Sequence, residues 1–213
     1  MKIGIYGGSF NPIHFGHIGL AKWVIENTDL DEVWLMVSPN NPLKDKSILA
    51  DEQERLQKAR EAIEAYPQPL PESTPKSELF RGPRHGKGAI ECNEAKGKRI
   101  WVSDFEFHLP RPTYTANTLR ALAKEYPNHE FTLIIGEDNL QIFDQWREHQ
   151  YILEHYRVFV YPRRYAASTQ GATQPAAGTQ PREATLPAKG TIFLTGAPYF
   201  DISSTELRKN LHI

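Results

Sequence analysis

The stretch that decides the fold is residues 7–17, GGSFNPIHFGH, which directly follows a short apolar segment at the start of the chain. The apolar segment predicts a strand, after which Gly7 and Gly8 let the backbone turn and leave no side chains in a ligand's way. His14 and His17 stand three residues apart where a helix begins. Two imidazoles and several backbone N–H groups therefore point to one spot, a geometry that suits a bound phosphate.

The glycine spacing of this stretch differs from that of two common phosphate-binding motifs. It does not fit GxGxxG, and no Lys-Ser/Thr follows as in GxxxxGK[ST]. Histidine replaces lysine as the group that faces the phosphate.

A second anion-binding element is expected at residues 202–208, ISSTELR. Ser203 is a plausible N-cap, and Glu206 three residues later completes a capping box, which alone indicates only a capped helix. The first turn also offers two hydroxyls and a guanidinium suited to phosphate, from Ser204, Thr205 and Arg208.

Strand and helix patterns alternate along the chain. Strands are expected at 2–6, 32–37, 99–103, 130–135, 157–161 and 191–195. Helices are expected at about 16–27, 51–65, 115–125, 139–155 in pieces, and 204–211. This order predicts an α/β fold, a Rossmann-like parallel sheet with helices on both faces. Ligands of such sheets bind beyond the carboxyl ends of the strands, where the turn at 7–10, the loop 39–44 and residues 136–138 would converge.

A chain of 213 residues suits one domain, here 1–213, and two segments interrupt its pattern. Residues 67–98 are rich in proline and residues 163–190 in Ala, Thr, Gln, Pro and Gly, which predicts flexible insertions. With a net charge of −1, the chain has no overall positive field that would attract a nucleic acid backbone. The single cysteine excludes an internal disulfide. No targeting or membrane segment is visible, so we expect a cytoplasmic protein without a nucleic-acid or membrane partner. The oligomeric state stays open.

Residues 7–17 resemble the HxGH signature of the nucleotidyltransferase superfamily, whose two histidines bind and stabilise the α-phosphate of a nucleoside triphosphate. Residues 202–208 resemble the ISSTxxR element of nicotinate and nicotinamide mononucleotide adenylyltransferases. Three further segments are similar to elements of that family, PxxxPxK, RxxSYTxDTL and IIGxDxLxxxxxxW, at 39–44, 111–119 and 134–146. Thr113 stands where serine is usual, which keeps the hydroxyl. Asn117 stands where aspartate is usual, which leaves its role open.

The resemblance implies adenylyl transfer from ATP, carried with Mg²⁺, to nicotinate mononucleotide, giving deamido-NAD and pyrophosphate in NAD biosynthesis. It assigns catalysis to His14, His17 and Arg208. It assigns ATP binding to Gly7, Gly8, Ser9, Phe10, His14, His17, Gly136, Asp138, Ser203, Ser204, Thr205 and Arg208. It assigns substrate binding to Asn40, Lys44, Thr115 and Trp146. No protein-bound metal site is expected, because the histidines lack the spacing of metal ligands.

The choice of substrate follows from Thr115 and Trp146. A backbone N–H at a helix start favours the carboxylate of nicotinate over the carboxamide, and a tryptophan suits stacking on the cationic pyridine ring. Plainer interpretations remain: Trp146 as a core aromatic, Asp138 as the N-cap of a helix over 139–143, and Lys44 as a solvated lysine. The alternative functions are a nicotinamide mononucleotide adenylyltransferase, another HxGH nucleotidyltransferase, and a non-catalytic nucleotide-binding module.

Overall fold

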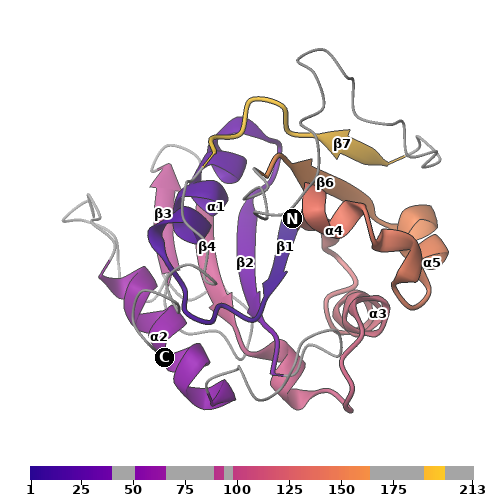
Figure 1. Cartoon of the computed structure of the whole chain (residues 1–213), viewed down its shortest axis with the longest axis horizontal. Helices are drawn as coiled ribbons and strands as arrows, with labels where there is room; N and C mark the ends of the chain where they lie inside the picture. The colour runs from indigo at the N-terminus through magenta and orange to yellow at the C-terminus, as the bar shows by residue number, and fades with distance from the viewer. Residues whose placement is uncertain (40–50, 66–88, 94–97, 164–189, 200–213) are drawn as a thin grey trace, which may run out of the picture.

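The computed structural model of the chain describes residues 1–39, 51–65, 89–93, 98–163 and 190–199 (Figure 1). Within these ranges the strands are β1 (Lys2–Gly8), β2 (Glu32–Val37), β3 (Ala89–Asn93), β4 (Lys98–Ser103), β5 (Glu130–Gly136), β6 (Arg157–Tyr161) and β7 (Thr191–Phe193). The helices are α1 (Phe15–Asn27), α2 (Glu52–Glu64), α3 (Thr115–Glu125), α4 (Glu137–Leu140) and α5 (His149–His155), with 3-10 turns η2 (Phe105–His108) and η3 (Phe143–Gln145).

The described strands form one sheet in the order β3-β4-β2-β1-β5-β6-β7. All neighbours pair in parallel except β3 and β4, so the predicted parallel α/β sheet is confirmed. The chain leaves β1 toward β2 on one side and later returns to β5 on the other. The carboxyl end of β1 is therefore the point where the strand order reverses, which is where open α/β sheets bind ligands.

Strand β3 is not among the predicted strands, and it lies within residues 67–98, which the sequence interpretation treats as a flexible insertion. Residues 89–93 pair antiparallel with β4, with an irregularity between Glu91 and Asn93. The physical reason is local: only four residues separate the two strands, so a short reversal suffices to cover the open edge of β4. The predicted helix 204–211 lies outside the described residues.

The core has two halves, one on each face of the sheet (Figure 1). Helices α1 and α2 cover one face, where residues such as Val24, Leu35 and Ala59 are fully buried. Helices α3 and α5 cover the other, with Leu119 and Ile152 fully buried. Alternate residues of each strand serve opposite faces, as the period of two requires. Both faces of the central strands are thus buried, which makes their carboxyl ends rigid supports for a site.

Candidate functional site

The carboxyl ends of β1, β2, β5 and β6 lie next to one another in the sheet. Gly8 is opposite Val37 in the β1–β2 register, and Gly136 is opposite Tyr161 in the β5–β6 register. One further bond continues the first ladder, because the Ser38 N–H donates to the Gly8 carbonyl at 2.9 Å. The predicted convergence of the segments after β1 and β5 is therefore present at this edge of the sheet.

The glycine turn differs in detail from its sequence interpretation. Strand β1 continues through both glycines, and the left-handed residue is Phe10, with φ of 44°. Phe10 is buried, and a Cβ on Gly8 would meet its ring at 3.1 Å, so Gly8 makes room for that ring. A Cβ on Gly7 would meet nothing within 4 Å. Gly7 therefore leaves open space above the end of the central strand.

His14 and His17 flank the first turn of α1, as the spacing predicts. His14 is the N-cap residue, and its backbone N–H donates to Nδ1 of His17 at 3.2 Å, while the ring centroids lie 3.7 Å apart. Because Nδ1 of His17 accepts a hydrogen bond, the proton of the neutral ring belongs on Nε2. His17 is thus prepared to donate through Nε2.

The His14 ring is partly buried, and neither of its nitrogens has a hydrogen-bond partner within the described part of the chain. Burial, and secondarily the positive charge of Arg163, lower the pKa of His14 from 6.5 to about 4. His14 is therefore a neutral imidazole at pH 7. Buried polar atoms normally find a partner, so unpaired ring nitrogens beside a helix N-terminus point to a ligand.

Gly136 and Asp138 form the second half of the site, at the start of α4. Gly136, and not Asp138, is the N-cap, so the interpretation of Asp138 as a helix cap is wrong. The reason is that helix α4 begins at Glu137, which puts Asp138 inside its first turn. A Cβ on Gly136 would meet Oδ1 of Asp138 at 2.3 Å, so the carboxylate lies directly over the glycine.

Arg163 pairs with Asp138, and the sequence analysis did not identify it. Its Nη1 donates to Oδ2 of Asp138 at 2.5 Å, whereas the buried Oδ1 has no partner among the described residues. A guanidinium that touches Asp138 and also lowers the pKa of His14 links the two halves of the site. Its only sequence signal is its position, two residues after the end of β6.

A pair of tyrosines supports both halves from within the sheet. The hydroxyls of Tyr6 and Tyr161 are 3.3 Å apart and buried, and burial raises the pKa of both phenols. The Tyr6 ring lies 6.3 Å from the ring of His17, and a Cβ on Gly136 would meet the Tyr161 ring at 3.1 Å. The two tyrosines therefore stay protonated at neutral pH and act as packing.

Thr115 and Trp146 belong to neighbouring segments. Thr115 is the first residue of α3, as predicted. Trp146 follows η3, packs on Phe143 with ring centroids 5.1 Å apart, and has a buried Nε1 without a partner in the described ranges. Arg147 lies 5.0 Å from the centroid of the Tyr114 ring, which brings the two segments together. Trp146 is only partly buried, so its contact with the core leaves part of it exposed.

Asn117 lies in the first turn of the same helix. It is exposed, and its Oδ1 accepts a hydrogen bond from Arg120 at 3.3 Å. This contact stays on the surface of α3.

Arg55 of α2 is a second residue that the sequence analysis missed. Its guanidinium donates to the carbonyls of Ser9 at 2.5 Å, Ser38 at 2.9 Å and Pro39 at 2.9 Å, and the residue is 1% exposed. Arg55 thus ties the turn after β1 to the segment after β2. A signal was present, because Arg55 shares the i, i+4, i+8 spacing of the buried residues Ala59 and Ile63.

Several predicted site residues lie outside the described residues: Asn40, Lys44, Ser203, Ser204, Thr205 and Arg208. Among the residues that the structure does describe, no group of three or more His, Cys, Asp or Glu side chains could hold a metal ion. In the same ranges, no helix is both long and apolar enough to cross a membrane.

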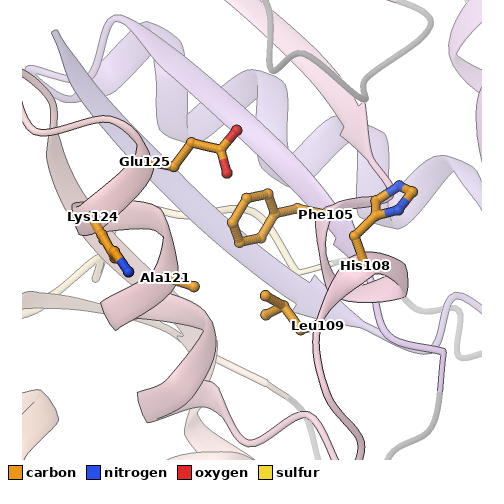
Figure 2. A pocket seen from close by; sticks show the side chains of 6 residues that line it. All are labelled: Phe105, His108, Leu109, Ala121, Lys124 and Glu125. Atoms are coloured by element: carbon orange, nitrogen blue, oxygen red, sulfur yellow. The ribbon is translucent and has the colours of Figure 1, made fainter.

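A hollow of about 350 Å³ lies elsewhere, between η2 and α3 (Figure 2). Its lining residues are Phe105, His108, Leu109, Ala121, Lys124 and Glu125. The hollow contains none of the predicted site residues, so the candidate site remains the strand edge described above.

Comparison with known proteins gives the class first. The cytidylyltransferase-like family model matches residues 5–210, nearly the whole chain. The structure is also similar to that of Plasmodium falciparum nicotinic acid mononucleotide adenylyltransferase complexed with NaAD. That likeness has a TM-score of 0.64 at 19% identity, covers 98% of this chain and 82% of the other, and concerns the fold alone. The chain is a nucleotidyltransferase, as the HxGH resemblance implies.

The curated relatives narrow the class to a family. The chain is 40% identical over 210 residues to a probable nicotinate-nucleotide adenylyltransferase of Bacteroides fragilis. The matched region covers 99% of this chain and 82% of the relative. A protein of Flavobacterium johnsoniae with the same name is 43% identical over 163 residues, covering 76% of this chain and 68% of the relative. The chain therefore belongs to the nicotinate-nucleotide adenylyltransferase family.

Proposed function

We propose that this enzyme transfers the adenylyl group of MgATP to nicotinate mononucleotide, giving deamido-NAD and pyrophosphate. A 5′-phosphate oxygen of the mononucleotide attacks the α-phosphorus, and the bond from that phosphorus to the bridging oxygen of the β-phosphate breaks. The observation that carries the proposal is the pair of histidines at the start of α1, on the same strand edge as Asp138 at the start of α4. The names of the relatives support the choice of acceptor.

His14 and His17 contact the α-phosphate in this proposal. The reaction passes through a state with charge on the equatorial oxygens, so donors fixed in advance lower its barrier. The bond from the His14 amide to Nδ1 of His17 leaves the proton of a neutral His17 ring on Nε2, and the ring nitrogens of the partly buried His14 have no partner in the described ranges. No covalent nucleophile is required, because positioning and charge neutralisation suffice.

Asp138 accepts hydrogen bonds from the vicinal ribose hydroxyls of ATP. Its buried Oδ1 is unpaired within the described residues, and its other oxygen is held by Arg163. A carboxylate has acceptor sites for both hydroxyls and for the guanidinium. Gly7 leaves open space for the triphosphate. The ATP-binding roles of Gly8, Ser9, Phe10 and Gly136 stay predictions from the family motifs.

The mononucleotide occupies the region between the start of α3 and Trp146. The amide of Thr115, the first in α3, precedes the helical hydrogen bonds that begin with Asn117 and Thr118, so it is available to the nicotinate carboxylate. The exposed part of Trp146 stacks on the pyridine ring. A carboxamide would put an NH₂ group against these donors, which disfavours nicotinamide mononucleotide.

The predicted roles of Asn40, Lys44, Ser203, Ser204, Thr205 and Arg208 stay predictions from the family motifs. The identity of the metal as Mg²⁺, which enters with ATP as part of the substrate, also stays a prediction from the family resemblance. The cytoplasmic location stays a prediction from the sequence. The rival function of a non-catalytic nucleotide-binding module is disfavoured by the presence of both histidines and Asp138 in one place.

Release of pyrophosphate tests the proposal. The purified enzyme is incubated with MgATP alone, with nicotinate mononucleotide, and with phosphopantetheine as the acceptor of another nucleotidyltransferase. We expect pyrophosphate only with the mononucleotide, and its near loss in the His17→Ala variant. Pyrophosphate release with no mononucleotide dependence, or turnover only with phosphopantetheine, would refute the proposed function.

A further inference from the structure

Glu106 is a buried carboxylate between two elements of the site, and the functional assignments above do not use it. The residue belongs to η2 and is 5% exposed. Its Oε2 accepts a hydrogen bond from the Ser38 hydroxyl at 2.8 Å, and its Oε1 accepts one from the Thr118 hydroxyl at 2.9 Å. Each carboxylate oxygen therefore holds a different segment of the chain.

One contact lies at the sheet edge and the other at the proposed mononucleotide site. Ser38 directly follows β2, and its N–H donates to the carbonyl of Gly8 in β1, so Ser38 is anchored to the sheet. Thr118 lies in the first turn of α3, three residues after Thr115. The N–H of Thr118 donates to the carbonyl of the N-cap residue Tyr114 at 3.0 Å, so the position of Thr118 also fixes the helix start.

The energetics argue against a role in stability alone. Burial raises the pKa of Glu106, because the charged form loses hydration, and the hydroxyls of Ser38, Thr118 and Thr113 offset part of that cost. Its hydrogen-bond donors among the described residues are neutral hydroxyls, not a cation. An apolar side chain would fill such a place at lower cost, since buried charges are expensive even when paired.

We propose that Glu106 is a positioning residue for the mononucleotide, which holds the first turn of α3 at a fixed separation from the end of β2. The inference rests on the proposed function, in which the start of α3 contacts the mononucleotide. ATP binds at the other parts of the strand edge, beside α1 and α4. Loss of the bridge should therefore affect the two substrates unequally.

Glu32 offers a matched control. It is a buried carboxylate of the same type, 1% exposed, whose Oε2 accepts a hydrogen bond from Trp34 Nε1 at 2.7 Å. Burial raises its pKa as well. It is the first residue of β2, whereas Ser38 follows the last, so Glu32 lies at the end of the strand opposite the site.

The experiment compares Glu106→Ala, Glu106→Gln, Thr118→Val and Glu32→Ala with the wild type, by thermal unfolding and by steady-state kinetics with each substrate varied. We expect Glu106→Ala to raise KM for nicotinate mononucleotide about tenfold and to change KM for ATP less than about twofold. Thr118→Val, which keeps the shape and removes the hydroxyl, should shift KM in the same selective way. Glu106→Gln should recover most of the loss, because an amide can bond both hydroxyls.

Glu32→Ala should lower Tm without a selective change in either KM. The inference is overturned if Glu106→Ala raises both KM values equally, or if it matches Glu32→Ala in every kinetic constant. If Glu106→Ala fails to fold, an unaltered KM for nicotinate mononucleotide in Thr118→Val overturns it. A wild-type enzyme without mononucleotide-dependent turnover would instead refute the proposed function, which separates the two failures.

Discussion

Gly7 and Gly8 are adjacent, yet the absence of a side chain matters for a different reason at each position. Alanine substitutions at the two positions can distinguish these reasons. A Cβ at Gly7 meets nothing within 4 Å, whereas a Cβ at Gly8 meets the buried Phe10 ring at 3.1 Å. We therefore expect Gly7→Ala to leave the fold intact and Gly8→Ala to strain it. If Gly7 is glycine because ATP approaches the strand end there, its substitution should be felt in ATP binding.

The magnitudes follow from this geometry. Gly7→Ala removes backbone freedom from the unfolded chain, worth about 0.5 kcal/mol, which raises Tm by roughly 1–2 °C in a domain of this size. Gly8→Ala should cost about 1–2 kcal/mol through overpacking against Phe10, which lowers Tm by roughly 3–6 °C. A methyl group in the path of the phosphates should raise KM for ATP by about tenfold or more in Gly7→Ala.

Thermal unfolding and ATP-dependent kinetics at saturating nicotinate mononucleotide check these values. The expected pattern for Gly7→Ala is a Tm at or above that of the wild type together with weakened use of ATP. A wild-type KM for ATP would show that the open space above Gly7 is not the nucleotide site. A fall in Tm equal to that of Gly8→Ala would show that Gly7 has a packing role.

The remaining predictions concern the histidines and Arg55. His17→Ala should lower kcat by roughly 10²-fold with an unchanged circular dichroism spectrum, because one preorganised donor is lost; near-wild-type turnover would contradict the role of His17. The pKa of His14 is about 4 in the folded chain and near 6.5 when unfolded, so the unfolded state binds more protons between these values and stability falls as pH drops from 6.5 to 4. Because the ring is partly exposed, that fall in the free energy of unfolding should be only about 1–2 kcal/mol. Measurements of unfolding at a series of pH values should show the fall in the wild type and not in His14→Gln. Arg55→Lys keeps the charge but loses the planar guanidinium that bonds three carbonyls, so it should cost about 3 kcal/mol of stability, roughly 10 °C in Tm. It should also reduce kcat/KM for both substrates. An unchanged Tm would refute the role of Arg55 in tying the turn after β1 to the segment after β2.

The parallel sheet could be predicted because its central strands are buried on both faces. The run from Phe131 to Ile135 is nearly all apolar, which is the mark of such a strand. Strand β3 could not be found in this way, because it covers an edge by backbone pairing with β4 and lies in a proline-rich region. Hydrophobic periodicity indicates which side chains are buried, so a strand that only pairs with the sheet edge leaves little periodic pattern in the sequence.

The site could be located from the sequence, but its internal contacts could not. His14 and Thr115 occupy helix starts that capping patterns and motif spacing identify. The left-handed residue falls at Phe10 because its ring packs over Gly8, a tertiary contact that a count of glycines does not contain. Arg163 and Glu106 act through partners 25 and 68 residues away, so no local pattern signals them.

The most direct test of the central claim is a competition between the two pyridine mononucleotides for limiting MgATP. Nicotinate and nicotinamide mononucleotides are supplied at equal concentration, and the ratio of deamido-NAD to NAD formed is the ratio of the two kcat/KM values. We expect deamido-NAD in excess by at least about tenfold, or about 1.4 kcal/mol, because the carboxamide NH₂ of nicotinamide mononucleotide would face backbone donors at the start of α3. Equal amounts of the two products, or an excess of NAD, would contradict this expectation.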